Sequence, residues 1–188
     1  VYRRATDAGH ASAAFNLGIL LAGAGRSAEA EEAYRRAMDG GHTDAPVGLG
    51  DLLADAGRSA EAEQLYRRAM DAGHASAAYN LGILLAGAGR SAEAEEAYRR
   101  AMDGGHASAA VGLGVLLARS GREQEAEEVY RRAMDAGHAS AAFNLGNLLA
   151  RGGRSAEAEE VYRRAMDAGH ASAAFNLGNL LARGGRSA

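Results

Sequence analysis

Asparagine, arginine and aspartate side chains recur at fixed intervals along this chain of 188 residues, and these types can bind polar ligands. An asparagine amide supplies both a hydrogen-bond donor and an acceptor, so it can satisfy one peptide unit. An arginine can hold a carboxylate through two parallel hydrogen bonds. The candidate binding residues are Asn16, Asn80, Asn144, Asn147, Asn176, Asn179, Arg119, Arg151, Arg183, Asp44, Asp51 and Asp55.

The six histidines recur every 32 residues: His10, His42, His74, His106, His138 and His170. A metal centre needs several ligands that converge on one point. One histidine per repeat instead places them in a line along one edge. The chain has no cysteine, which excludes disulfides and thiolate metal sites. We therefore expect these histidines to form hydrogen bonds in loops, and we expect no metal and no other cofactor.

The same 32-residue step runs through the whole chain. Tyrosines mark it at Tyr2, Tyr34, Tyr66, Tyr98, Tyr130 and Tyr162. A stub (1–9) and a half unit (170–188) flank five complete units: 10–41, 42–73, 74–105, 106–137 and 138–169. A fixed period of this length is typical of solenoids built from stacked units. The sequence predicts one array over residues 1–188.

Each unit contains two helical patterns, so the expected fold class is all-α. In unit 138–169, Leu145 and Leu149 share one face of the first helix, which Gly153 ends, and Tyr162 lies on the apolar face of the second. The expected helices are 1–8 (a stub), 11–23, 28–40, 43–55, 60–72, 75–87, 92–104, 107–119, 124–136, 139–151, 156–168 and 171–183.

Local details of the unit support the two-helix pattern. Ser155 suits the N-cap of the second helix. Glu159 and Arg163 form an i, i+4 pair on its polar face, which we interpret as solvated. Gly146 lies inside the first helix, where glycine costs about 1 kcal/mol relative to alanine. Its recurrence in every unit predicts a close approach of the partner helix.

The pattern Leu145-Gly146, Leu149, Ala158, Tyr162 and Ala165 resembles the tetratricopeptide (TPR) repeat signature. The junction 165–178 is similar to that of Sel1-like repeats, so the unit reads as a short, 32-residue hybrid of the two. The resemblance implies an α-solenoid, a right-handed superhelix of helix–turn–helix repeats. It also implies a scaffold for protein–protein interaction.

The candidate residues occupy the third, seventh, tenth and fourteenth positions of the unit, which share one face of the first helix. By the resemblance, this face lines the concave groove, and the asparagine before Leu-Gly corresponds to one that grips a peptide backbone. Three alternatives stay open: the positions vary because they are exposed, the asparagines bond a neighbouring helix, and the arginines favour a helix C-terminus.

Composition narrows the function further. The net charge of −3 gives no overall electrostatic footprint for nucleic acid. No apolar run approaches a membrane span and no signal peptide is visible, so we expect a cytoplasmic location. No nucleophile–base–orienter set appears, so we do not expect an enzyme. The leading hypothesis is a scaffold that binds an extended peptide or partner segment, and the alternative is a structural, self-assembling array.

The two ends of the chain suggest self-association. Val1 falls in mid-repeat, so we expect the chain to be a piece of something longer. Leu177, Leu180 and Leu181 are expected to lack part of their cover in the final half unit. The stub that contains Tyr2 could complete this half unit in another copy, and a pairing of two final helices is the alternative.

Overall fold

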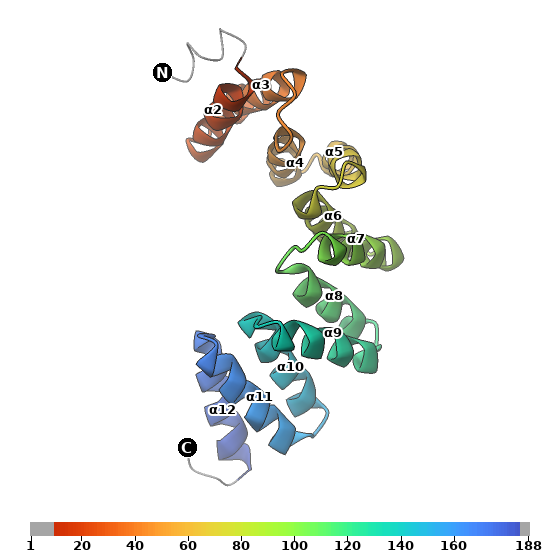
Figure 1. The fold of residues 1–188 in the computed structure, drawn as a ribbon, viewed down its shortest axis with the longest axis vertical. Coiled ribbons are helices and arrows are strands. Elements are labelled where there is room, and N and C mark those ends of the chain that lie inside the picture. Colours follow the sequence, from red (N-terminus) through yellow and green to blue (C-terminus); the bar gives the residue numbers. More distant parts are fainter. Residues whose placement is uncertain (1–9, 185–188) are drawn as a thin grey trace. The chain divides into compact units, whose positions relative to one another are not determined.

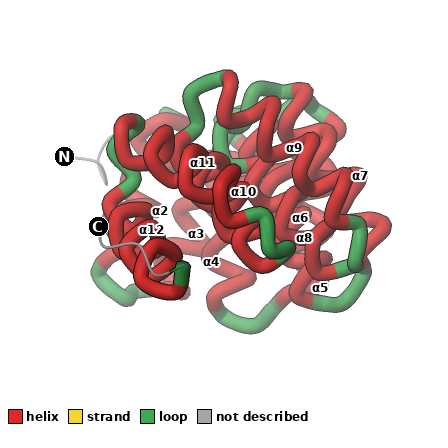
Figure 2. Tube along the Cα trace, turned by 90° about the horizontal axis from the view of Figure 1, so that it is seen from below, coloured by secondary structure: helices red, strands yellow, loops and turns green. Residues whose placement is uncertain are grey.

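The computed structural model describes residues 10–184, which form helices joined by short turns, and no strand occurs in this range (Figures 1 and 2). The helices are α2 (Ala11–Gly23), α3 (Ser27–Asp39), α4 (Ala45–Asp55), α5 (Ser59–Asp71), α6 (Ala75–Gly87), α7 (Ser91–Asp103), α8 (Ala109–Arg119), α9 (Glu123–Asp135), α10 (Ala139–Arg151), α11 (Ser155–Asp167) and α12 (Ala171–Arg183). The all-α repeat architecture is confirmed. The expected stub helix 1–8 lies outside the described residues.

We call the even-numbered helices A helices and the odd-numbered ones B helices. The bounds of α2, α6, α10 and α12 match the sequence-based expectation. Every B helix starts and ends one residue earlier than expected. Helices α4 and α8 start two residues later than expected, and in α4 the proline at position 46 lies in the first turn, where its missing N–H costs little.

The early start of the B helices overturns the expected serine N-cap. Arg154 occupies the N-cap of α11, and Ser155 is already helical. The Nε and Nη2 groups of Arg154 donate to Glu157 at 2.7 and 2.6 Å. This bidentate pair joins the N-cap to the third helical residue, the two positions that a capping box links. Ion pairs of the same spacing recur at the start of the other B helices.

Glycine ends the helices, as the sequence predicts. Gly153 has φ of 77° after α10, and Gly169 has φ of 86° after α11. These left-handed conformations are costly for residues that carry a Cβ. Two glycines per unit therefore fix the two tight turns that fold each helix back on the one before it.

The glycine inside each A helix from α2 to α10 makes room for the tyrosine of its own repeat. A Cβ added to Gly114 would lie 2.3 Å from Cε1 of Tyr130, and one added to Gly146 would lie 2.5 Å from Cε1 of Tyr162. Both rings are buried. The expected close approach is present, and the group that approaches is an aromatic ring. The glycine therefore allows the two helices of a repeat to pack closely around the buried tyrosine ring.

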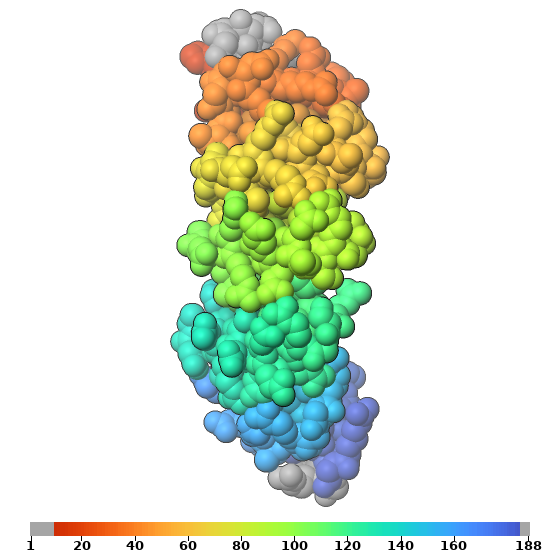
Figure 3. Space-filling model, turned by 90° about the vertical axis from the view of Figure 1, so that its right-hand side faces the viewer, coloured from red at the N-terminus to blue at the C-terminus, as the bar shows by residue number. Residues whose placement is uncertain are grey.

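The helices form two compact units, Val1–His106 and Ala107–Ala188. In each unit a helix packs on its neighbours in sequence, and each A helix also contacts the next A helix. Successive repeats occupy successive colour bands in a space-filling view of the units (Figure 3). The A helices of a unit thus form one layer and the B helices another. The single array expected over 1–188 stays a prediction.

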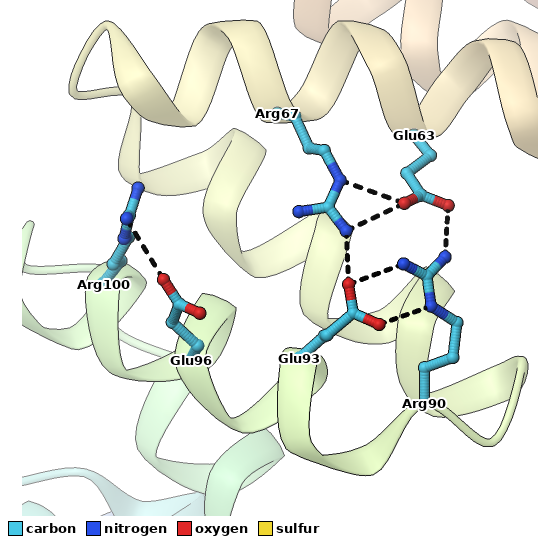
Figure 4. A network of polar contacts seen from close by, with 6 residues as sticks. All are labelled: Glu63, Arg67, Arg90, Glu93, Glu96 and Arg100. Carbon is cyan, nitrogen blue, oxygen red and sulfur yellow. Dashed lines mark hydrogen bonds and ion pairs between the residues drawn. The ribbon is translucent and has the colours of Figure 1, made fainter.

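Arginine–glutamate pairs connect successive B helices. Arg67 and Arg90 lie between Glu63 of α5 and Glu93 of α7, and the four side chains form a closed network (Figure 4). The distances are 2.9 Å for Arg67–Glu63, 2.7 Å for Arg67–Glu93, 2.7 Å for Arg90–Glu63 and 2.6 Å for Arg90–Glu93. The expected solvated polar face therefore also joins one repeat to the next.

The network predicts an acid-sensitive contribution to stability. Hydrogen bonds from Arg90 and Arg67 lower the pKa of Glu93 to about 2. Because this folded-state pKa is below the ordinary 4.5, the contribution is complete above pH 4.5 and is lost as the pH falls toward 2. Glu93→Gln should lower the thermal midpoint at pH 7 and have little effect near pH 2. Equal effects at both pH values would contradict this role.

Candidate functional site

In the first unit, Asp51 connects two repeats through one carboxylate oxygen. Its Oδ1 accepts from the Tyr66 hydroxyl at 2.6 Å and from Nδ2 of Asn80 at 2.7 Å. Asp51 and Tyr66 belong to one repeat, and Asn80 belongs to the next. The alternative in which the asparagine bonds a neighbouring helix is therefore the arrangement observed for Asn80.

The second unit repeats this arrangement without the charge. Oδ1 of Asn147 accepts from the Tyr162 hydroxyl and from Nδ2 of Asn176, both at 2.7 Å. The Oδ1 of Asn147 is thus the shared acceptor, which leaves its Nδ2 as a donor. Asn147 differs from Asp51 in two respects: its side chain is neutral, and its Nδ2 remains as a donor.

In the first network, the pKa values of Asp51 and Tyr66 are shifted from their ordinary values. Burial raises the pKa of Asp51, hydrogen bonds from Tyr66 and Asn80 lower it, and the negative charge of Asp55 raises it further, so that the net direction is upward. Burial and the Asp51 carboxylate together raise the pKa of Tyr66. Asp51 is therefore a carboxylate whose negative charge is not fully compensated in the folded chain.

A surface hollow of about 490 Å³ lies between α10 and α12, and we call it the C-terminal hollow. Tyr162 is a buried member of its lining, and no acidic residue lines it. Five of the residues predicted from the sequence line it together: Asn147, Arg151, Asn176, Asn179 and Arg183. The hollow is therefore positively charged and rich in amides.

A second hollow, of about 310 Å³, lies between α2 and α4, and we call it the N-terminal hollow. Its lining residues Ala22, Ser27 and Tyr34 precede Ala150, Ser155 and Tyr162 of the C-terminal hollow by 128 residues. At the positions of Asn179 and Arg183 it carries Asp51 and Asp55. The same place in the repeat thus has opposite charge in the two units.

The other predicted residues lie outside these linings. Arg119 is exposed at the end of α8, at the position that Arg151 and Arg183 occupy in α10 and α12. Asn144 donates from Nδ2 to the Ser140 carbonyl of its own helix at 2.8 Å. Asn16 is exposed on α2, and Oδ1 of Asp44 lies 3.9 Å from Nδ1 of His74. Asp44 is therefore separate from the acidic pair Asp51 and Asp55.

Three of the histidines, His42, His106 and His170, stack on aromatic rings, which sequence reasoning missed. The ring of His106 lies 4.3 Å from that of Tyr79, and His170 lies 4.2 Å from Phe143, centroid to centroid. In the described residues Nδ1 of His106 is buried with no hydrogen-bond partner, and burial lowers its pKa. Loop hydrogen bonding does occur at His42, whose Nδ1 accepts from the Asp44 N–H. These stacks connect successive repeats.

Within residues 10–184, no cluster of three or more possible ligands could hold a metal ion. None of the helices described there is long and apolar enough to cross a membrane.

The leucines of α12 lack part of their cover, as the sequence predicts. Leu177 and Leu181 are 8% and 9% exposed, whereas their equivalents Leu145 and Leu149 are 0% and 1% exposed; packing of α12 on α11 supplies most of the cover. Leu180 is half-buried. The exposed apolar group is Phe175, at 72%. Its equivalents Phe15 and Phe143 stack on the histidine of the next unit, His42 and His170.

Self-association through this surface stays a prediction, and Tyr2 lies outside the described residues. We expect the apparent mass in light scattering to rise with concentration. Phe175→Ser together with Leu180→Glu should return the chain to the monomer mass, because the exposed apolar surface is removed. A monomer at every concentration, unchanged by the substitutions, would contradict the prediction.

Comparison with solved structures agrees with the repeat fold. YrrB, a TPR protein with an unusual peptide-binding site, is 23% identical, with a TM-score of 0.63, 90% of this chain and 92% of that chain covered. MamA is 22% identical, with a TM-score of 0.67 and coverage of 80% and 93%. PilF of Pseudomonas aeruginosa is 19% identical, with a TM-score of 0.73 and coverage of 95% and 90%. No curated protein sequence matches the chain.

The paired helices, their 32-residue step and the tyrosine–glycine contacts define a helix–turn–helix repeat protein. The Tetratricopeptide repeat family matches residues 1–45, 47–105, 101–139, 132–169 and 143–188. The chain therefore belongs to the tetratricopeptide repeat family. The Sel1-like component of the expected resemblance stays a prediction.

Proposed function

We propose that the chain is a protein-interaction scaffold whose A helices hold an extended peptide or a partner's segment. The observation that carries this proposal is the pair of hollows at equivalent places in the two units. Their walls are the same in Ala22 and Ala150, Ser27 and Ser155, and Tyr34 and Tyr162. Their rims differ in charge.

The A and B layers of each unit differ in how much their sequences vary and in how many of their charged side chains are paired. The B helices repeat nearly the same sequence, and many of their arginines and glutamates pair with each other, as in the network of Arg90 and Glu93. The A helices vary at the seventh, tenth and fourteenth positions of the unit. In the described residues Arg119, Arg151 and Arg183 form no ion pair. The A layer therefore combines unpaired charge with variation between units, whereas the B layer is nearly uniform.

The asparagines divide between two roles in this proposal. Asn80 and Asn176 join successive repeats, so they position their neighbours. Asn147 and Asn179 line the C-terminal hollow and can offer amide groups to a peptide backbone. YrrB, which has the same fold, is a TPR protein with a peptide-binding site, and this likeness supports a peptide as the ligand.

A peptide array tests the proposal against a structural, self-assembling array. We expect a subset of extended peptides to bind, and Arg151→Glu to change which peptides bind because it alters the A layer. Arg163→Glu, on a B helix of the same unit, should leave the pattern unchanged. An array without any reproducible binder would contradict the proposed function.

A further inference from the structure

The C-terminal hollow carries two arginines that no carboxylate among residues 10–184 pairs with, although each lies in the last turn of its helix. Arg151 and Arg183 are exposed and form no ion pair among residues 10–184. Most arginines of the B helices in the same unit are paired, with Arg132 of α9 an exception: Arg163 lies 2.7 Å from Glu159, and Arg164 lies 3.1 Å from Asp135. Two unpaired arginines beside one hollow therefore present a concentrated positive charge on a chain whose net charge is −3.

The spacing of the two arginines limits the ligand. They occupy the same position of two adjacent A helices, and packed helices lie about 8–10 Å apart. Side chains at i and i+2 of an extended peptide lie on the same side, about 7 Å apart. Each guanidinium can bind one carboxylate bidentately. A peptide with two acidic side chains separated by one residue comes within about 1–3 Å of this spacing, a difference that two long arginine side chains can span.

The amides of the hollow complement such a peptide. Because Oδ1 of Asn147 already accepts from Tyr162 and Asn176, its Nδ2 group remains as a donor at the rim. Asn179 adds a donor and an acceptor on the other wall. These amides can therefore form hydrogen bonds with the backbone N–H and C=O groups between the two acidic side chains of a bound peptide, without a further charged residue.

We propose that the C-terminal hollow recognises an acidic segment of a partner protein through carboxylates at i and i+2, bound by Arg151 and Arg183. This inference rests on the proposed function and names the chemistry of the partner. The N-terminal hollow supplies an internal contrast, because Asp55 stands there at the position of Arg183. It should repel the same segment.

The test is fluorescence anisotropy with labelled peptides of the form Glu-x-Glu in an Ala/Ser background, amidated at the C-terminus. We expect the Glu-x-Glu peptide to bind, and its Gln-x-Gln and Lys-x-Lys versions to bind at least about tenfold more weakly, since charge-assisted hydrogen bonds are lost. Arg151→Gln with Arg183→Gln should weaken binding of the acidic peptide by about tenfold or more. Arg151→Lys should have an intermediate effect, because lysine cannot bind bidentately.

The matched control is Arg163→Gln with Arg164→Gln, which removes the same charge from the same unit on the B layer. Circular dichroism should show that all variants keep the wild-type helix content. As a gain of function, the triple variant Gly23→Arg, Asp51→Asn and Asp55→Arg, which gives the N-terminal hollow the residues found at Arg151, Asn179 and Arg183, should add a second, weaker site for the acidic peptide and raise the measured stoichiometry.

Three results would overturn the inference: equal binding of the glutamine peptide, equal loss in the control pair, or binding only of a peptide with a free C-terminal carboxylate. If the acidic peptide fails but other peptides of the array bind the A layer, the inference is wrong and the proposed function stands. If no peptide of any composition binds, both fail.

Discussion

Gly114→Ala is expected to destabilise the second unit, although alanine normally favours a helix over glycine by about 1 kcal/mol. The added Cβ would lie 2.3 Å from Cε1 and 2.5 Å from Cζ of Tyr130. That ring is 2% exposed, so it cannot swing into solvent without losing its burial. Overpacking of a well-packed core costs about 1–3 kcal/mol. After the propensity gain of about 1 kcal/mol is subtracted, we expect a net loss of up to about 2 kcal/mol in the free energy of unfolding.

The chain contains a matched control for this prediction. Gly178 occupies the same position in α12, and a Cβ there meets nothing within 4 Å. Gly178→Ala should therefore raise stability by about the helix-propensity difference of 1 kcal/mol. Urea unfolding followed by circular dichroism measures both variants. A stabilised Gly114→Ala variant would show that the tyrosine contact does not require glycine.

Asp51→Ala and Asp51→Asn are expected to change stability in opposite directions at pH 7. Alanine removes the acceptor shared by the Tyr66 hydroxyl and Asn80, and an unsatisfied donor costs about 1–3 kcal/mol when buried. Asparagine keeps an acceptor, as Asn147 does in the equivalent network of the second unit. It also removes the repulsion between the Asp51 and Asp55 carboxylates.

The raised pKa of Asp51 determines whether Asp51→Asn stabilises or destabilises the folded chain at a given pH. The pKa of Asp51 is raised, chiefly by burial, above its ordinary value of 3.8. Its contribution to stability is therefore fully present below pH 3.8 and is lost as the pH rises through the folded-state pKa. Asp51→Asn should raise the thermal midpoint at pH 7, and this advantage should shrink toward pH 3. A constant difference between wild type and Asp51→Asn would contradict it.

Much of the fold follows from the repeat itself. The 32-residue step, the glycines at the turns and the apolar faces predict eleven helices of the described range within one or two residues. The misplaced starts have a physical reason in the B helices. Arg154 is the N-cap and pairs with Glu157 across the first turn, and the serine after it is already helical. Reading Ser155 as the cap followed general preference and ignored this specific ion pair.

The candidate site was predictable in its residue types and less so in its contacts. Asn80 bonds Asp51 and Asn176 bonds Asn147, each pair 29 residues apart, and helical periodicity cannot reveal such a partner. A signal is nevertheless present in the sequence. Where the tenth residue of a unit is isoleucine, at Ile19 and Ile83, the seventh residue of the next unit is glycine: Gly48 and Gly112. The two positions vary together because they meet between repeats.

The opposite charge of the two hollows also needed the structure. The sequence places Asp51, Asp55, Arg151 and Arg183 on one helical face. Only the structure shows that two of these residues line each hollow, with a buried tyrosine behind them. The two hollows share the same wall, but the N-terminal hollow has an acidic rim and the C-terminal hollow a basic one. This difference in charge is how the repeats would distinguish between partners.

The most direct test of the central claim, that the A layer binds an extended segment, is an NMR titration of the ¹⁵N-labelled chain with the tightest peptide of the array. Saturable shifts of the Asn147 and Asn179 side-chain amides and of α10 and α12 backbone amides are the predicted result, with the B helices little changed. Shifts confined to the B helices, or no saturable shift with any peptide, would contradict it.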